Sequence, residues 1–123
     1  MTTTRPGLAI QRGAHFFATH PDLAIKLEKT RRRILLAPDQ LLHPEVSLAY
    51  IVRLGKLRVT QFLPAGTEVT RAVLQAGALL TVAEITPEQA DPAADVYYLS
   101  EMVLMALGEV ELWALSAEIL DQD

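Results

Sequence analysis

The side chains that most often bind metals or catalyse reactions are few and far apart in this sequence. The three histidines are His15, His20 and His43, and they lack the His-x-His spacing of a metal site built on strands. The absence of cysteine excludes disulfides, thiolate nucleophiles and cysteine-bound iron–sulfur clusters. Glu109 and Glu111 share a strand face at spacing i, i+2, a pattern more typical of a solvated surface than of a catalytic pair. We therefore expect no enzymatic activity, no metal site and no cofactor.

Charge is distributed unevenly along the chain. All 11 Lys and Arg residues lie at or before Arg71, whereas ten of the 15 acidic residues follow it. We expect a fold that interleaves the two parts; the alternative is an acidic surface that recruits a basic partner. In either case the second part has no fixed cation with which to bind a phosphate. The three arginines at 31–33 lack an aromatic platform or a second basic cluster, so we expect no nucleic-acid binding by them.

Hydrophobic periodicity predicts short antiparallel strands separated by tight turns. Residues 48–54 alternate, with Leu48, Tyr50, Val52 and Leu54 on one face. Glycines at positions 55, 66 and 77 mark turns, and Pro-Ala-Gly at 64–66 is typical of a hairpin loop. Further strands are expected at residues 35–36, 41–42, 56–63, 67–74 and 109–115, and the apolar run 96–107 is expected to pair on a buried face.

The flanking segments are expected to be irregular or helical. We expect residues 1–13 to be flexible and residues 14–123 to form a single domain, because 123 residues suit one domain. A helix is predicted to begin at Pro21 and to end near residue 34, with Arg31–Arg33 at its C-terminal end. Residues 81–95 contain two prolines and are predicted to be a loop, and a helical turn is predicted to open at Ser116. No segment resembles a signal peptide or a membrane span, so we expect a cytoplasmic protein.

Three consecutive stretches carry a resemblance to a known family. They are YIVRLGKLRV at 50–59, FLPAGTEVT at 62–70 and AVLQAGAL at 72–79. This glycine spacing resembles the sensor domain of the Crp/Fnr (catabolite-activator-like) transcription regulators, and the match extends over residues 29–119. The resemblance implies a mainly β fold: a cyclic-nucleotide-binding-like antiparallel β-roll, or jelly-roll-like double-stranded β-helix, with flanking short helices.

The family's phosphate-binding cassette is not preserved. In the family, Phe-Gly-Glu follows the last glycine turn and binds the phosphate and ribose, and a later Arg-Ser-Ala or Arg-Thr-Ala triplet supplies a cation and a hydroxyl. Here Leu80-Thr81-Val82 stands in the first place, and the triplet aligns with Ser100-Glu101-Met102, so a carboxylate replaces the guanidinium. We expect no binding of cyclic AMP or cyclic GMP through this cassette. The degenerate cassette positions are Gly77, Leu79, Leu80, Thr81, Val82, Ser100, Glu101 and Met102.

The resemblance supports a regulatory sensor domain with a degenerate pocket. Aliphatic side chains at the cassette positions and nearby favour a small apolar effector or a collapsed pocket. The chain ends at Asp123, where the family's dimerisation helix would begin, so we expect no DNA-binding helix-turn-helix and no direct nucleic-acid or membrane binding. Expected partners are a second copy in a homodimer, a small apolar effector or a protein. The apolar residues are Leu79, Leu80, Val82, Val103 and Met105.

Two other interpretations remain open. A stand-alone interaction or structural module on the same fold would use the acidic second part as its partner face. An enzyme of the cupin type is the least favoured. Haem ligation, found in some relatives, would have to use His43, Met102 or Met105, although a Met on an apolar strand usually belongs to the core.

Overall fold

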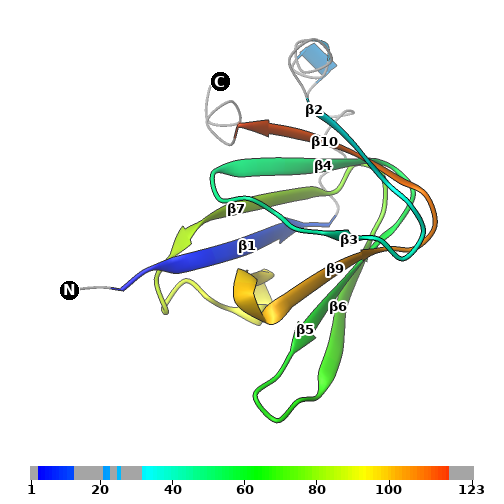
Figure 1. The fold of residues 1–123 in the computed structure, drawn as a ribbon. Helices are drawn as coiled ribbons and strands as arrows, with labels where there is room; N and C mark the ends of the chain where they lie inside the picture. The colour runs from blue at the N-terminus through cyan, green and yellow to red at the C-terminus, as the bar shows by residue number, and fades with distance from the viewer. Residues whose placement is uncertain (1–2, 13–20, 23–24, 26–31, 117–123) are drawn as a thin grey trace.

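The computed structural model describes residues 3–12, 21–22, 25 and 32–116. In this part of the chain, strands form two antiparallel sheets, and two short 3-10 turns, η1 (Pro92–Ala94) and η2 (Leu99–Glu101), lie between strands (Figure 1). The mainly β prediction is confirmed. The larger sheet has the order β2-β10-β4-β7-β1-β8, and the smaller has the order β3-β9-β5-β6. The strands are β1 (Arg5–Gln11), β2 (Arg32–Leu36), β3 (Leu41–Leu42), β4 (Leu48–Leu54), β5 (Leu57–Phe62), β6 (Glu68–Leu74), β7 (Leu79–Ile85), β8 (Val96–Tyr98), β9 (Met102–Ala106) and β10 (Val110–Ser116).

One apolar core holds the two sheets together. Alternate residues of β4, β5, β7, β9 and β10 point into it, as period-two patterning requires. Tyr50 and Val52 are buried there and Leu48 packs at its margin, as predicted, but Leu54 is 58% exposed. A bulge opposite Glu111 and Leu112 inserts Arg53 as an extra residue, and this turns Leu54 to the outer face.

The two oppositely charged parts of the sequence interleave strand by strand. In the larger sheet, β2, β4 and β1 come from the basic part and alternate with β10, β7 and β8 from the acidic part. Cross-strand ion pairs follow, such as Arg33 on β2 with Glu111 on β10 at 2.7 Å. The predicted interleaving is confirmed, and it places each part's charges beside their opposites.

The expectation that residues 1–13 are flexible is wrong for β1. This strand lies between β7 and β8 inside the larger sheet, and Leu8 and Ile10 point into the core (Figure 1). Pro6 and Gly7 are both residues that weaken a strand. Pro6 has no N–H to donate, and this is tolerated because β8 pairs only with residues 7–9. Gly7 lies close to Ile85, and a Cβ there would overlap the Ile85 side chain.

Three other boundaries differ from expectation. Residues 81–85 were predicted to be a loop but continue β7, because Val82 and Ile85 find buried positions there. The apolar run 96–107 is interrupted by η2, so it supplies one strand to each sheet. Arg32 and Arg33 lie in β2 and not at the end of a helix, since both pair with β10.

The predicted helices are described only in part. Pro21, Asp22 and Ile25 have helical backbone, which agrees with a helix that begins at Pro21. The remainder of that helix, and the turn predicted from Ser116 onward, fall outside the described residues.

The predicted glycine turns are confirmed. Gly55, Gly66 and Gly77 all have positive φ, with values of 87°, 88° and 97°. Gly66 closes the β5–β6 hairpin, which extends beyond the body of the molecule at the bottom of Figure 1. Gly55 differs from Gly66 in its surroundings, because a Cβ at Gly55 would overlap the backbone carbonyl oxygen of Glu109, whereas nothing lies near one at Gly66.

Gly55→Ala is expected to destabilise the protein more than Gly66→Ala. Both substitutions place a Cβ on left-handed backbone, which lowers the free energy of unfolding by about 1–2 kcal/mol. Gly55→Ala also creates a steric overlap with backbone atoms, which cannot rotate away. This overlap should lower the free energy of unfolding by a further amount of about 1–3 kcal/mol. Urea denaturation of the two variants measures the difference. Equal losses would show that the contact with Glu109 does not constrain this turn.

Candidate ligand site

The first half of the degenerate cassette lies on β7 and in the turn before it. The Gly77 N–H donates to the carbonyl of Val52 at 2.8 Å, which ties this turn to β4. Leu80 and Val82 are completely buried in the core between the sheets. Leu79 and Thr81 alternate to the opposite face of β7, so they do not share this interior.

The second half of the cassette lies on η2 and at the start of β9. Met102 points into the same core as Leu80 and Val82, and Ser100 is exposed. Val103 and Met105 were predicted to line an apolar pocket with them, and this is wrong. They lie on the opposite face of β9 from Met102 and Leu104, because the strand alternates.

Glu101 is bound by the protein's own side chains. The Nε2 of Gln61 on β5 donates to its Oε2 at 3.0 Å, and the Nε of Arg71 on β6 donates to the Oε1 of Gln61 at 2.8 Å. Gln61 is 7% exposed, so its amide is out of water and both ends are satisfied inside the protein. We call Arg71, Gln61 and Glu101 the polar bridge. It links a guanidinium to the carboxylate that the sequence resemblance aligns with the cassette's cation position.

A second polar cluster adjoins the polar bridge on the larger sheet. The Arg71 guanidinium carbon lies 5.9 Å from the centre of the Tyr97 ring. The Tyr97 hydroxyl donates to Asp95 Oδ1 at 3.0 Å, and Arg12, just after β1, makes a two-pronged ion pair with Asp95 at 2.7 and 2.8 Å. The hydrogen bond from Arg12 lowers the pKa of Asp95, and burial raises the pKa of Tyr97. Contacts between Arg71 and Tyr97 therefore connect the smaller sheet to the larger one.

Sequence reasoning missed Gln61, Arg71, Asp95 and Arg12. Arg71 was noted only as the last basic residue of the chain. A second bulge, between Val59 and Thr60 in the β5–β6 pairing, makes Arg71 the extra residue of β6. The sequence did contain a signal for Gln61, because this polar residue shares the inward face of its strand with the apolar residues Leu57 and Val59.

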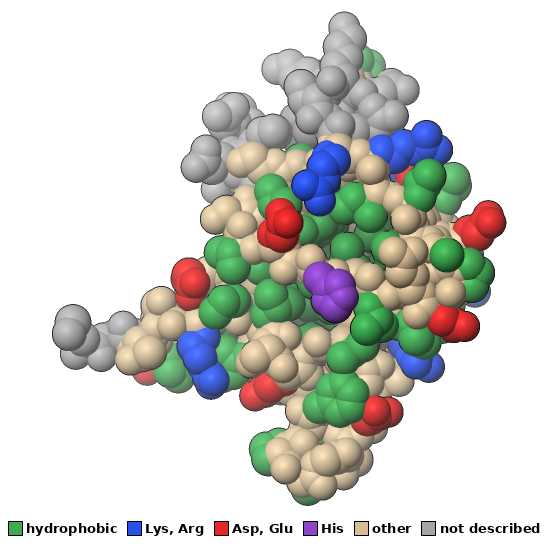
Figure 2. All heavy atoms as spheres, in the orientation of Figure 1, with side chains coloured by type: hydrophobic (Ala, Val, Ile, Leu, Met, Phe, Trp, Pro, Cys, Tyr) green, Lys and Arg blue, Asp and Glu red, His purple; other side chains and the backbone are tan. Residues whose placement is uncertain are grey.

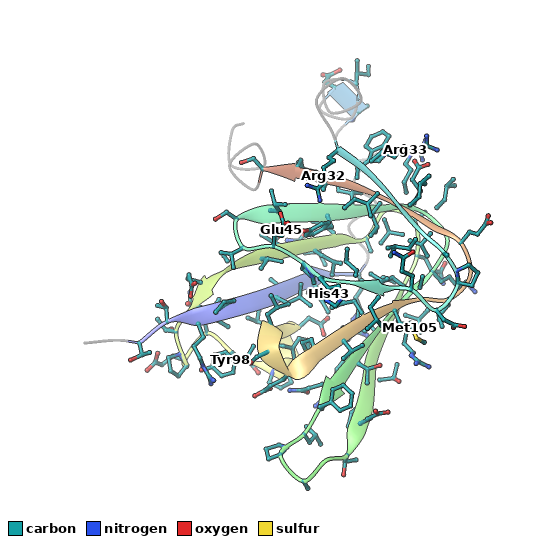
Figure 3. All side chains as sticks on the ribbon, in the orientation of Figure 1. Arg32, Arg33, His43, Glu45, Tyr98 and Met105 are labelled. Atoms are coloured by element: carbon teal, nitrogen blue, oxygen red, sulfur yellow. The ribbon has the colours of Figure 1, made fainter. Side chains whose placement is uncertain are left out.

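The three candidate haem ligands do not converge. Met102 is in the core, Met105 lies on the outer face of β9, and His43 is exposed. Figure 3 shows His43 just past β3 and apart from Met105 on β9. Among the described residues, no group of three or more His, Cys, Asp or Glu side chains could hold a metal ion.

A groove of about 610 Å³ lies elsewhere, at the β2 edge of the larger sheet. Leu35 and Leu54 form an exposed apolar part of it, and the Arg33–Glu111 ion pair lies on one wall. None of the predicted cassette positions is among its lining residues. The lining residues are Arg33, Leu35, Leu36, Ala37, Gln40, Leu54, Glu109, Val110 and Glu111.

Solved structures share this arrangement of strands. The N-terminal domain of a transcriptional regulator from Streptomyces coelicolor matches 89% of this chain and 75% of that chain, with a TM-score of 0.60 and 21% identity. The Thermus thermophilus catabolite activator protein matches 88% and 48%, with a TM-score of 0.57 and 19% identity. A cyclic nucleotide-binding-like protein from Brucella abortus matches 87% of both chains, with a TM-score of 0.54 and 19% identity.

These matches define the class of the fold. The chain shares the fold of these proteins, a cyclic-nucleotide-binding-like β-roll, as the sequence resemblance predicted. It spans 48% of the catabolite activator and 44% of the CO-dependent transcription factor CooA. No family model and no curated protein sequence matches the chain. In the described residues, no helix is long and apolar enough to cross a bilayer.

Asp95→Asn is expected to remove a contribution to stability that depends on pH. Because the folded pKa of Asp95 lies below the ordinary value of about 3.9, the ion pair stabilises the fold above that pH. The contribution is lost as the pH falls through the folded pKa. Asn tolerates the left-handed backbone at Asp95 and still accepts from Tyr97, so the change isolates the charge.

Thermal denaturation across the acid range measures this effect. Above about pH 4 the variant should be less stable by up to about 1 kcal/mol, since the Arg12 side chain is 49% exposed. The difference should shrink at lower pH, and Arg12→Ala should lose stability in the same pH window. A difference that is independent of pH would contradict the assignment.

Proposed function

We propose that this chain is the regulatory sensor domain of a Crp/Fnr-like transcription regulator whose ligand site is filled by its own side chains. It does not bind cyclic AMP or cyclic GMP through the family's cassette. The polar bridge carries this proposal, because Glu101 replaces the cation that a phosphate requires and is already paired with Gln61. A phosphate there would meet a carboxylate, and the nearby Arg71 already donates to Gln61.

The apolar cassette positions support a closed site over one open to a small effector. Leu80 and Val82 are completely buried, and Met102 is 8% exposed. A ligand that entered between the sheets would have to displace these side chains from the core, at a cost set by their lost burial. The site is thus collapsed, and the polar bridge performs the cross-linking that a bound anion would otherwise provide.

Neighbours in fold show why the ligand has to be argued from the site. CooA is described as a CO-dependent transcription factor, and the Xanthomonas campestris regulator CLP as responsive to c-di-GMP. One scaffold therefore accompanies different signals, and the fold does not determine the ligand. Both of these neighbours are described as regulators, which supports a regulatory and non-enzymatic role in the cytoplasm. Any DNA binding would belong to a part outside this chain.

Isothermal titration calorimetry with cyclic AMP and cyclic GMP tests the proposal directly. Neither nucleotide should give a saturable heat with the full chain, because the cation position holds a carboxylate. Saturable binding of either one at micromolar concentration would overturn the proposal.

A double-mutant cycle tests the polar bridge. Glu101→Met and Arg71→Met should each lower the free energy of unfolding by about 1–3 kcal/mol, because each removes a hydrogen-bond partner of the buried Gln61 amide. The double variant should lose less than the sum, with a coupling energy of about 1 kcal/mol through Gln61. Glu84→Gln, an exposed carboxylate on β7, is the control and should have little effect. Strict additivity would show that the three side chains do not act together.

A further inference from the structure

A row of four side chains crosses the outer face of the smaller sheet. Leu41, Met105, Arg58 and Val73 lie directly opposite one another on β3, β9, β5 and β6. We call these four residues the Arg58 row. Leu41 is 40% exposed and Val73 is 46% exposed, and Met105 and Arg58 are partly buried between them. Side chains paired across strands touch, so the row is one continuous surface and not a set of isolated apolar residues.

Arg58 lacks an acceptor within the described part of the chain. Its Nε is buried and has no hydrogen-bond partner there. Its Nη2 lies 3.9 Å from the sulfur of Met105, which is a weak acceptor. A guanidinium that is partly removed from water without a carboxylate costs stability. The contrast with Arg71, which is paired to Gln61, shows that the sheet can satisfy an arginine where the fold needs one.

We propose that the Arg58 row docks a segment of a partner protein that presents a carboxylate between aliphatic side chains. The carboxylate would accept from the terminal Nη groups of Arg58, because Nε is buried, and a two-pronged geometry of this kind suits the guanidinium. Aliphatic side chains on either side of it would cover Leu41 and Val73. An arginine at the centre of a small apolar patch is a common anchor of protein interfaces.

The surroundings of the row favour a protein over other occupants. Hydrophobic side chains gather around His43 on the face in view, and basic side chains are isolated there and not clustered around it (Figure 2). A single cation suits one carboxylate better than a polyanion or an anionic membrane, which need several. A second copy related by a twofold axis through the row would bring Arg58 against Arg58, which is unfavourable.

The stability of Arg58→Met is the first test. Methionine keeps most of the apolar stem and removes the unpaired charge, so the melting temperature should stay the same or rise by a few degrees. The matched control is Arg71→Met, which removes the hydrogen bond to Gln61 and should lower the melting temperature. A loss in Arg58→Met as large as that in Arg71→Met would show that Arg58 is structural and overturn the proposal.

Binding to a synthetic probe is the second test. The probe is an alanine-based helical peptide with one glutamate between two leucines on the same face, and its control has glutamine in place of glutamate. Titration of the full chain, followed by nuclear magnetic resonance, should give saturable shifts at the Arg58 Nε–H and at the methyl groups of Leu41 and Val73. The glutamine peptide should bind roughly tenfold more weakly. Arg58→Met should abolish the shifts, and Arg58→Lys should weaken them because a lysine cannot bind in two-pronged fashion.

Several outcomes would overturn the proposal. Equal binding of the glutamate and glutamine peptides, or no shifts with the glutamate peptide, would remove the role of the carboxylate. Arg58-dependent sedimentation with phosphatidylglycerol vesicles would assign the face to a membrane. An Arg58-dependent dimer in light scattering would assign it to a second copy.

Discussion

The shared interior of the two sheets accepts polar groups only when they are paired. Most inward positions are aliphatic, but β5 places the amide of Gln61 inside, next to Met102. An amide removed from water needs both a donor and an acceptor nearby. Arg71 supplies the donor and Glu101 supplies the acceptor. If either residue were replaced by an apolar one, the Gln61 amide would lose a hydrogen-bond partner inside the protein. The proposed closure of the ligand site rests on this requirement.

The same requirement explains how charge is arranged over the rest of the fold. The basic and acidic parts of the chain alternate in the larger sheet, so opposite charges meet across neighbouring strands. Arg12 and Asp95 join the end of β1 to the turn before β8, and Arg33 and Glu111 join β2 to β10. These exposed pairs add little energy each. Their value is to define which strands lie side by side.

The scaffold and its ligand chemistry are separable in this protein. The turns at Gly55, Gly66 and Gly77 have the positive φ angles that the β-roll uses, whereas the positions aligned with the family's phosphate-binding cassette hold no basic residue. A fold of this kind can retain a regulatory surface after losing its original ligand site. Arg58 marks such a surface, because it is an arginine that the fold itself does not pair.

Local patterns in the sequence were enough to predict the strands from residue 48 to 74, since alternation and glycine turns depend on near neighbours. The family resemblance implies that Leu80, Thr81 and Val82 stand at cassette positions, and this assignment stays a prediction. The place of β1 could not be predicted, because Pro6 and Gly7 become acceptable only beside β7 and β8. The polar bridge was equally hidden. Two bulges redirect Leu54 and Arg71, and a bulge arises from the pairing of strands far apart in the sequence. Residue types therefore determined which chemistry was absent from this chain, whereas long-range strand register decided which side chains meet inside it.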